Sequence, residues 1–238
     1  GYRWAGMTWL DAIMHMFSTM GLGGFSSHDA SFGFFDSPAI EAVSIAFMLI
    51  AGCNFATHYV VLSRRSFRPY LTDPEAGAFL LVSVGSVIAI AIFLDVHGVY
   101  PTFSEALRFS AFNVVSIATT TGYASTDYAL WPMFAPLWML FLSSFATSAG
   151  STGGGIKMIR AIVLYKQVYR ELTRAMHPNA IHPVKIGSEL VPSNILFAVL
   201  AFGFMYMVCI VSMTLALSFS DLEIVTAFTA VVASINNT

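Results

Sequence analysis

Three short segments rich in Gly, Thr and Asn recur along the chain, each directly after an apolar stretch. They are GLGG at residues 21–24, TTTG at 119–122 and NNT at 236–238. The segments carry no formal charge, so the groups they offer are backbone carbonyl oxygens, which glycine can turn to one side because it tolerates positive φ. Rings of carbonyl oxygens replace the hydration shell of a monovalent cation. The loops therefore predict a cation-coordinating filter.

The stretch before each loop also recurs. We call this preceding stretch the prelude. In the first copy the prelude TFSEALRF at 102–109 comes before VVSIATTTGY at 114–123, and in the second SFSDLEIV at 218–225 comes before VVASINNT at 231–238. A weaker third copy has TWLDAIMH at 8–15 before FSTMGLGGF at 17–25. Because prelude and loop recur together, the pattern predicts an internal repeat. Each copy is predicted to be a short helix, started by an acid (Asp11, Glu105 or Asp221), whose partly negative C-terminus faces the ion.

A second glycine-rich string, SAGSTGGGIK at 148–157, interrupts a long apolar run. Successive glycines disfavour a helix by about 1 kcal/mol each relative to Ala, so the helix is predicted to break here. The phosphate-binding pattern G-x-x-x-x-G-K-[ST] is not met, because Met158 follows Lys157. We expect a gating loop below the filter, with a packing kink as the alternative. Its residues are Gly150, Ser151, Thr152, Gly153, Gly154, Gly155 and Lys157.

The elements that position these loops are predicted to lie in a membrane. The 238 residues are 57% hydrophobic and only 10% charged, with a mean hydropathy of +0.74. Uncharged runs at 42–63, 77–94, 128–156 and 191–220 are each predicted to cross the bilayer, which takes about 20 helical residues. The stretches at 8–22, 109–121 and 224–238 are too short, so we expect them to enter and return. Both chain ends look cut, which indicates a fragment.

Positive charge is confined mainly to two segments. They contain Arg64, Arg65 and Arg68, and then Lys157, Arg160, Lys166, Arg170, Arg174 and Lys185. The positive-inside rule places both segments in the cytoplasm. The acidic connections around 28–41, 95–105, 127 and 221–223 are expected outside. The basic segment at 157–174 could bind anionic lipid or a regulatory partner, with a plain topological anchor as the simpler reading.

Several long strings resemble one family closely. They are STMGLGGFSSHDAS, AGCNFATHYVVLSRR, TTTGYASTDYALWP, AGSTGGGIKMIRAIVLYKQ, MHPNA and VVASINNT. The chain resembles the TrkH-type subunits of the Trk/Ktr/HKT superfamily of potassium uptake proteins over essentially its whole length. That resemblance implies an all-α integral membrane fold with pseudo-fourfold repeats of helix, re-entrant pore helix with filter loop, and helix. The first repeat and the end of the fourth would be missing.

The resemblance also implies which residues bind potassium and how the chain divides. Gly23 and Gly122 would be the filter glycines of the second and third repeats. The expected filter residues are Gly21, Leu22, Gly23, Thr120, Thr121, Gly122, Asn237 and Thr238. The second repeat would contribute residues 1–70, the third 71–190 and the fourth 191–238.

The expected function is potassium uptake across the bacterial cytoplasmic membrane, with potassium as substrate, no bound cofactor and no metal site other than the filter. The resemblance implies a homodimer that works with a cytosolic nucleotide-binding regulatory subunit and contacts membrane lipid, without nucleic acid. Passive flux and ion-coupled symport both remain open. The alternative is a broken-helix secondary carrier for sodium or a small solute. An intramembrane enzyme is disfavoured, because the mid-membrane polar residues are Gly, Thr, Ser and Asn rather than paired Asp, Glu or His. His58 is expected to be a packing group.

Overall fold

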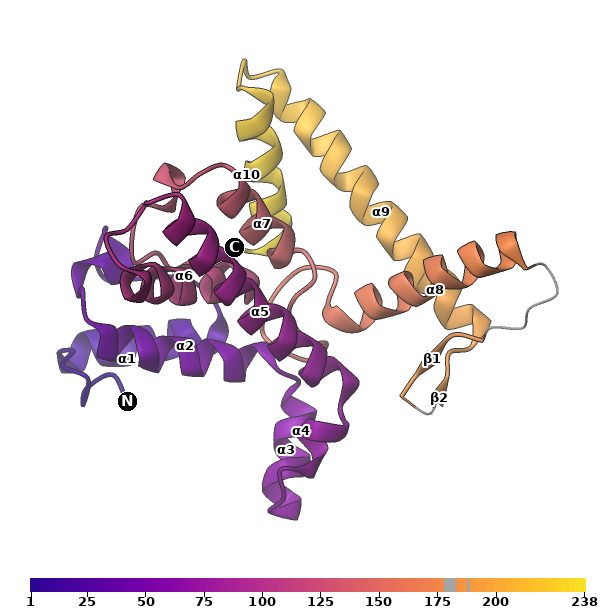
Figure 1. Ribbon diagram of the computed structural model, residues 1–238, viewed down its shortest axis with the longest axis horizontal. Helices are drawn as coiled ribbons and strands as arrows, with labels where there is room; N and C mark the ends of the chain where they lie inside the picture. Colours follow the sequence, from indigo (N-terminus) through magenta and orange to yellow (C-terminus); the bar gives the residue numbers. More distant parts are fainter. Residues whose placement is uncertain (178–182, 188) are drawn as a thin grey trace.

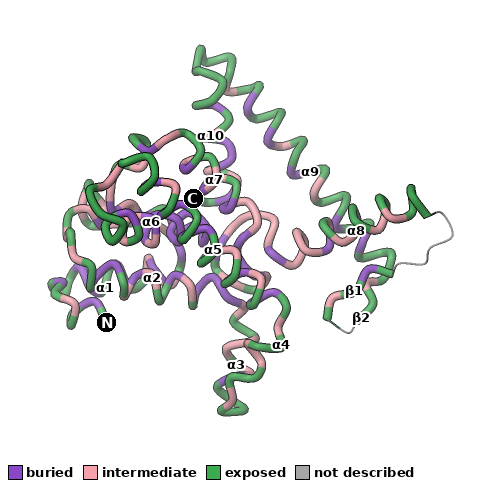
Figure 2. Tube along the Cα trace, viewed as in Figure 1, coloured by how far each residue is buried: buried purple, intermediate pink, exposed green. Residues whose placement is uncertain are grey.

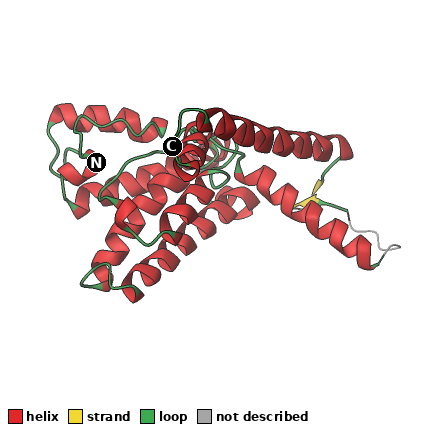
Figure 3. Ribbon diagram, turned by 90° about the horizontal axis from the view of Figure 1, so that it is seen from above, coloured by secondary structure: helices red, strands yellow, loops and turns green. Residues whose placement is uncertain are grey.

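The computed structural model describes residues 1–177, 183–187 and 189–238, and nearly all regular structure in them is helical (Figure 1; Figure 3). The elements in chain order are α1 (Trp9–Gly21), α2 (Pro38–Gly52), α3 (Phe55–Arg64), α4 (Arg68–Thr72), α5 (Pro74–Val96), α6 (Phe103–Ala118), α7 (Phe134–Ser143), α8 (Met158–Met176), β1 (Lys185–Ile186), β2 (Glu189–Leu190), α9 (Ser193–Ser218) and α10 (Ile224–Asn236). Short 3-10 turns lie at Ser31–Phe34 and Tyr128–Leu130.

The three short helices predicted before the loops are present as α1, α6 and α10. Thr8 caps α1 by accepting a hydrogen bond from the Asp11 N–H at 3.1 Å, and Thr102 caps α6 through the Glu105 N–H at 3.3 Å. A Thr followed three residues later by an acid is a common helix start. Helix α10 differs, because Asp221 lies in a turn before it and its first turn holds no acid. The prediction that Asp221 starts this helix is therefore wrong.

Two helices in the described part of the chain, α5 with 23 residues and α9 with 26, are long and apolar enough to cross a membrane. They correspond to the predicted spans at 77–94 and 191–220. The run at 42–63 forms α2 and α3, which are bent by 96° and count as a span only if taken together. The run at 128–156 contains the ten-residue α7 followed by a loop. The end of α7 before the glycine-rich string agrees with the helix break predicted there, whereas the bend within 42–63 was not predicted.

The bend between α2 and α3 has a local cause. Cys53 is extended, and the Asn54 side chain restarts the helix by accepting a hydrogen bond from the Ala56 N–H at 2.8 Å. The backbone groups freed at the bend are taken by the glycine-rich loop: the Ser148 N–H donates to Gly52 O at 2.9 Å, and the Phe55 N–H donates to Gly150 O at 3.1 Å. The backbone groups left free at the bend and those in the glycine-rich loop therefore form hydrogen bonds with each other.

Helix α6 is the centre of the packing. It lies against α2, α5 and α7, and its second half is buried, including Phe112, Asn113 and Val114. Helix α9 is exposed along most of its length, as Figure 2 shows. Its exposed side chains include Phe197, Phe204 and Leu215. Large apolar groups on an outer helix face are what lipid contact requires, since lipid replaces water as the solvent there.

The basic segment after the glycine-rich loop is helical. Helix α8 carries Arg160, Lys166, Arg170 and Arg174 and leads away from the helices around α6, crossing the start of α9 near the hairpin β1–β2 (Figure 1). The two strands pair antiparallel, with Lys185 opposite Leu190. Most of the MHPNA string, together with His182, lies outside the described residues.

Candidate functional site

The three loops begin with the same backbone turn. At the end of each short helix one N–H bonds to the carbonyl three residues back and the next N–H to the carbonyl five back, which is the Schellman ending. After α1, the Leu22 N–H bonds to Thr19 O and the Gly23 N–H to Ser18 O. After α6, the Thr120 N–H bonds to Ile117 O and the Thr121 N–H to Ser116 O. After α10, the Asn237 N–H bonds to Ser234 O and the Thr238 N–H to Ala233 O, and all six distances are 2.8–3.3 Å. Leu22, Thr120 and Asn237 all have positive φ.

This shared turn fixes how the loops correspond. It aligns Leu22 with Thr120, Gly23 with Thr121, and Gly24 with Gly122. Gly24 and Gly122 also share positive φ, at 69° and 83°. The backbone equivalent of Gly122 is thus Gly24, whereas the family resemblance implied that Gly23 is the counterpart of Gly122. By the same register Gly21 aligns with Thr119, one position before the turn.

The three loops meet around one cavity of about 290 Å³. Its lining comes from all three: Gly23, Gly24, Phe25, Thr121, Gly122, Ala233, Ser234, Asn237 and Thr238. A Cβ at Gly24 would overlap the Thr121 carbonyl oxygen, and one at Gly122 would lie 3.3 Å from the Thr238 carbonyl carbon. Within the described residues, no donor bonds the carbonyl oxygens of Gly23 or Gly122. The C-termini of α1, α6 and α10 therefore bring unpaired carbonyls and partly negative helix ends to one place.

Side chains behind the α6 loop hold it in position. The Ser116 hydroxyl donates to Tyr123 O at 2.7 Å, and the Asn113 side chain bonds both the hydroxyl and the backbone N–H of Ser125. The hydroxyls of Thr119 and Thr121 bond each other at 2.8 Å. Ser, Thr and Asn side chains therefore fix the backbone of this loop.

The glycine-rich loop lies against the inner ends of all three short helices. The Thr152 hydroxyl donates to Met20 O of α1 at 3.1 Å, and the Gly154 N–H donates to the Thr120 hydroxyl after α6 at 2.7 Å. A Cβ at Gly154 would overlap the Asn236 carbonyl oxygen of α10, so only glycine allows this approach. The loop thus contacts the C-terminal ends of all three short helices.

The remaining residues of this loop fold it on itself. The Lys157 ammonium donates to Gly153 O and lies 3.4 Å from the Ser151 hydroxyl, which in turn donates to Ser148 O at 2.6 Å. Gly150 packs against Asn54, with 3.0 Å between its would-be Cβ and the Asn54 Oδ1. Gly155, at φ 80°, lies close to Ser144 O. All seven residues predicted for the gating loop therefore lie in one contiguous structure.

Three residues that support the site were given no role from the sequence, although Asn236 belongs to the NNT segment. Asn54 restarts α3 beside Gly150. Asn236, fully buried, accepts a hydrogen bond from the Tyr206 hydroxyl at 2.7 Å and donates to Ser143 at 3.0 Å, so it ties α10 to α9 and α7. Glu75 bonds the backbone of the glycine-rich loop. Asn54 could have been detected, because an Asn that follows Gly and Cys in an apolar run is a helix-cap signal. Asn236 and Glu75 bond to distant residues, and such partners leave no local pattern in the sequence.

His15 and His58 have structural partners. His58 bonds the Tyr70 hydroxyl through Nδ1 and Ile50 O at 2.8 Å through Nε2, as expected of a packing group. Buried His15 bonds Asp11 O and Ser26. Hydrogen bonds from the Thr8 and Ser27 hydroxyls lower the pKa of Asp11, at the outer end of α1. No group of three His, Cys, Asp or Glu side chains that could hold a metal occurs among the described residues.

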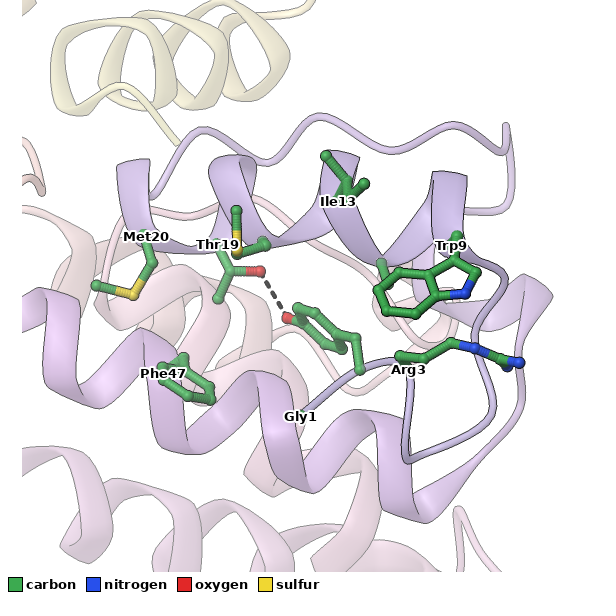
Figure 4. A pocket seen from close by; sticks show the side chains of 10 residues that line it. Gly1, Arg3, Trp9, Ile13, Thr19, Met20 and Phe47 are labelled. Carbon is green, nitrogen blue, oxygen red and sulfur yellow. Dashed lines mark hydrogen bonds between the residues drawn. The ribbon is translucent and has the colours of Figure 1, made fainter.

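A second cavity, of about 390 Å³, lies between α1, α2 and the first residues of the chain (Figure 4). Its lining is largely apolar and includes Trp9, Ile13, Met20 and Phe47. The hydroxyls of Thr19 and Tyr2 that line it are paired with each other at 2.6 Å, as the dashed line shows, and its other polar side chain, Arg3, is itself a cation. This cavity therefore lacks the free oxygens that a cation needs.

The sequence and the fold both match known proteins. Residues 3–238 match the TrkH family, described as a cation transport protein. The chain is 42% identical to the Trk system potassium uptake protein TrkH of Salmonella typhimurium over 98% of its length and 48% of that protein's, and 36% identical to TrkG of Escherichia coli. The crystal structure of the potassium transporter TrkH from Vibrio parahaemolyticus superposes with a TM-score of 0.96 at 40% identity, covering 99% of this chain and 51% of that one. The chain thus spans about half the length of these relatives.

Proposed function

Because this chain belongs to the TrkH family of cation transport proteins, we propose that it lines a pathway by which potassium enters the cell. The relatives are named as potassium uptake proteins. The observation that carries the proposal is the meeting of three Schellman-ended helices and their loops around one small cavity. Neutral carbonyls and helix C-termini favour a cation with a modest charge, which can bind and still leave.

We propose that the filter is formed by the loops after α1, α6 and α10. Potassium would be held by carbonyl oxygens among Gly21, Leu22, Gly23, Thr120, Thr121, Gly122, Asn237 and Thr238, with Gly24 added as the partner of Gly122. Residues 1–70, 71–190 and 191–238 would then represent the second, third and fourth repeats. The support is that each range contains one short helix and one loop of the shared geometry.

The glycine-rich loop is proposed to be the gate. It lies directly under the cavity and touches the ends of α1, α6 and α10, so an ion leaving the filter would meet it. Its bonds to the filter strands are few and its glycines leave the backbone free to rearrange. Displacement of residues 150–155 would therefore open the path without disturbing the filter itself.

The proposed setting is the bacterial inner membrane, with a second copy of the protein and a cytosolic nucleotide-binding subunit as partners. These partners rest on the family resemblance. The basic helix α8 begins at Met158, directly after Lys157 of the proposed gate, so it is the element through which a cytosolic partner could act on the loop. The carrier alternative predicts two interrupted helices in symmetric halves. Three equivalent loops at one cavity fit a channel-like pore better.

The experiment is potassium and rubidium uptake by a potassium-transport-deficient bacterium expressing the full-length protein, with Gly122→Ala beside the parent. The matched control is Gly98→Ala, because Gly98 also has positive φ, at 64°, but lies in a turn with nothing within 4 Å of its Cβ position. Both changes impose similar backbone strain, so we expect only Gly122→Ala to reduce uptake or admit sodium. Equal uptake by Gly122→Ala and parent, at equal protein levels, would refute the filter assignment.

A further inference from the structure

One buried carboxylate joins the two ends of the glycine-rich loop. Glu75 lies in the first turn of α5 and is only 5% exposed. Its Oε1 accepts a hydrogen bond from the Ala149 N–H at 2.6 Å, just before the loop, and from the Ile159 N–H at 3.0 Å, just after it. A single oxygen atom thus bridges two backbone positions ten residues apart in the chain.

Capping of α5 does not explain this carboxylate. Asp73 already caps that helix, since its Oδ1 accepts from the N–H groups of Glu75 at 2.9 Å and Ala76 at 3.3 Å. Among the described residues no cation forms an ion pair with Glu75. A buried carboxylate without partners is strongly unfavourable. The stabilising groups here are the two loop N–H donors and the positive N-terminus of α8, where Ile159 lies.

We infer that Glu75 is a positioning residue that holds the glycine-rich loop in place under the filter by fastening both of its ends to α5. This inference rests on the proposed gate. Because one oxygen atom carries both hydrogen bonds, releasing it frees Ala149 and Ile159 together. The loop would then be held by its bonds to Met20, Thr120 and Phe55, by the backbone bonds of Ile156 to Ser144 and of Met158 to Thr147, and by its own internal bonds.

The arrangement also links the position of α8 to the glycine-rich loop. Ile159 is the second residue of α8, while Glu75 stands on α5, which packs along the central helix α6. Moving α8 away from α5 therefore breaks the bond at Ile159 and leaves the bond at Ala149 in place. A small displacement of α8 in this way releases one end of the loop.

The test uses the full-length protein with a reporter thiol in place of Ser148. Ser148 is fully buried beside Ala149 and its hydroxyl has no hydrogen-bond partner, so Ser148→Cys removes no side-chain bond. In that background, Glu75→Ala and Glu75→Gln are compared for the rate of thiol modification from the cytoplasmic side and for potassium uptake. The control is Asp73→Asn, which removes a neighbouring negative charge but keeps a helix cap.

We expect Glu75→Ala to raise both the modification rate and the flux about tenfold, which corresponds to about 1.4 kcal/mol. Glu75→Gln keeps the size of the side chain and one acceptor oxygen, so it serves as the folded variant if Glu75→Ala fails to fold. We expect Glu75→Gln to raise the modification rate several-fold, because the charge-assisted hydrogen bonds of the carboxylate are stronger than those of a neutral amide. Asp73→Asn leaves both rates at the parent value. A modification rate equal to the parent's in the Glu75 variants overturns the inference. A raised rate with unchanged flux supports the bond to the loop and refutes the gate instead.

Discussion

At the scale of single residues, Gly23 and Gly24 of the first loop differ in how well they could accept a side chain. Gly24 has φ 69° and its Cβ position overlaps the Thr121 carbonyl oxygen, whereas the Cβ position of Gly23 meets only the exposed Phe25 ring at 3.3 Å. We therefore expect Gly24→Ala to lower potassium uptake more than tenfold. Positive φ alone costs an alanine about 1–2 kcal/mol, and the overlap adds to that.

The companion change, Gly23→Ala, is expected to leave uptake within about threefold of the parent, because the Phe25 ring can turn aside into open space. Uptake rates at matched protein levels separate the two variants. The opposite order, with Gly23→Ala the more harmful, would contradict the register that the Schellman turns define and restore the pairing of Gly23 with Gly122.

Thr120 gives a second prediction at this scale, because its hydroxyl is the partner of the Gly154 N–H at 2.7 Å. Thr120→Val keeps the shape and removes that acceptor, which leaves the loop N–H unpaired at a cost of about 1–3 kcal/mol. We expect the loop to leave the filter more often, so that potassium flux rises. Thr120→Ser keeps the hydroxyl and is expected to behave as the parent. A fall in flux for Thr120→Val would show that this bond supports the conducting state.

At the scale of elements, a cluster of charged groups joins the central helix α6 to its neighbour α2. Arg108 on α6 donates twice to Glu41 on α2, at 2.7 and 2.9 Å, and once to Asp36 at 2.8 Å. The Glu41 side chain is 3% exposed and that of Arg108 is 25% exposed. A nearly buried carboxylate depends on this partner, so the bond sets the position of α6 and therefore of its filter loop.

Arg108→Met is expected to destabilise the protein by about 3 kcal/mol, the lower end of the range for a broken buried pair, because the arginine is partly exposed. The measurement is the thermal unfolding midpoint of the purified full-length protein in detergent. Adding Glu41→Leu is expected to recover part of the loss, since it removes the stranded charge. Arg170→Met is the control, because its partner Glu171 is 51% exposed and such a pair is worth under about 1 kcal/mol. Equal shifts for the two arginine variants would contradict the role of this pair.

How well the sequence predicted each element depended on whether its cause was local. Helices α1 and α6 start at Thr8 and Thr102, where cap and acid are three residues apart, and both were predicted. The break after Ser143 was signalled by the glycines that follow. The bend at Asn54 was missed because the apolar run hides it, and its free backbone groups find partners near Ser148 and Gly150, about 100 residues away in the chain. A distant partner leaves no periodicity to detect.

At the scale of the whole molecule, the site depends on contacts among segments far apart in the chain. Gly24 meets Thr121, Gly122 meets Thr238, and Gly154 meets Asn236. The recurrence of the loops predicted that these segments act together, and in the structure they line one cavity. It could not set the register within one residue, because GLGG offers three glycines for one position. Only the backbone turn, which is a property of the folded helix end, resolves that choice.

The topology of the chain gives the last prediction. Helix α9 has 26 residues and a rise of about 1.5 Å per residue, so it crosses the bilayer and separates Ala175, at the end of α8, from Ser220. Helix α5 likewise separates the Arg64–Arg68 segment from Gly98. The charge pattern places Ala175 inside and both Gly98 and Ser220 outside. This requires residues 128–157 to make a net crossing, although α7 supplies only ten helical residues, or about 15 Å.

Single cysteines at Gly98, Ala175 and Ser220 of the full-length protein test this path, with a membrane-impermeant thiol reagent applied to intact cells. All three positions are exposed. We expect labelling at Gly98 and Ser220 in intact cells, and at Ala175 only after permeabilisation. The physical reason is that α7 and the glycine-rich loop together span the membrane, with the loop's irregular backbone shielded by the helix ends that it contacts. Labelling of Ala175 from outside would make residues 128–157 a re-entrant segment, and the loop would then approach the filter from the side by which potassium enters.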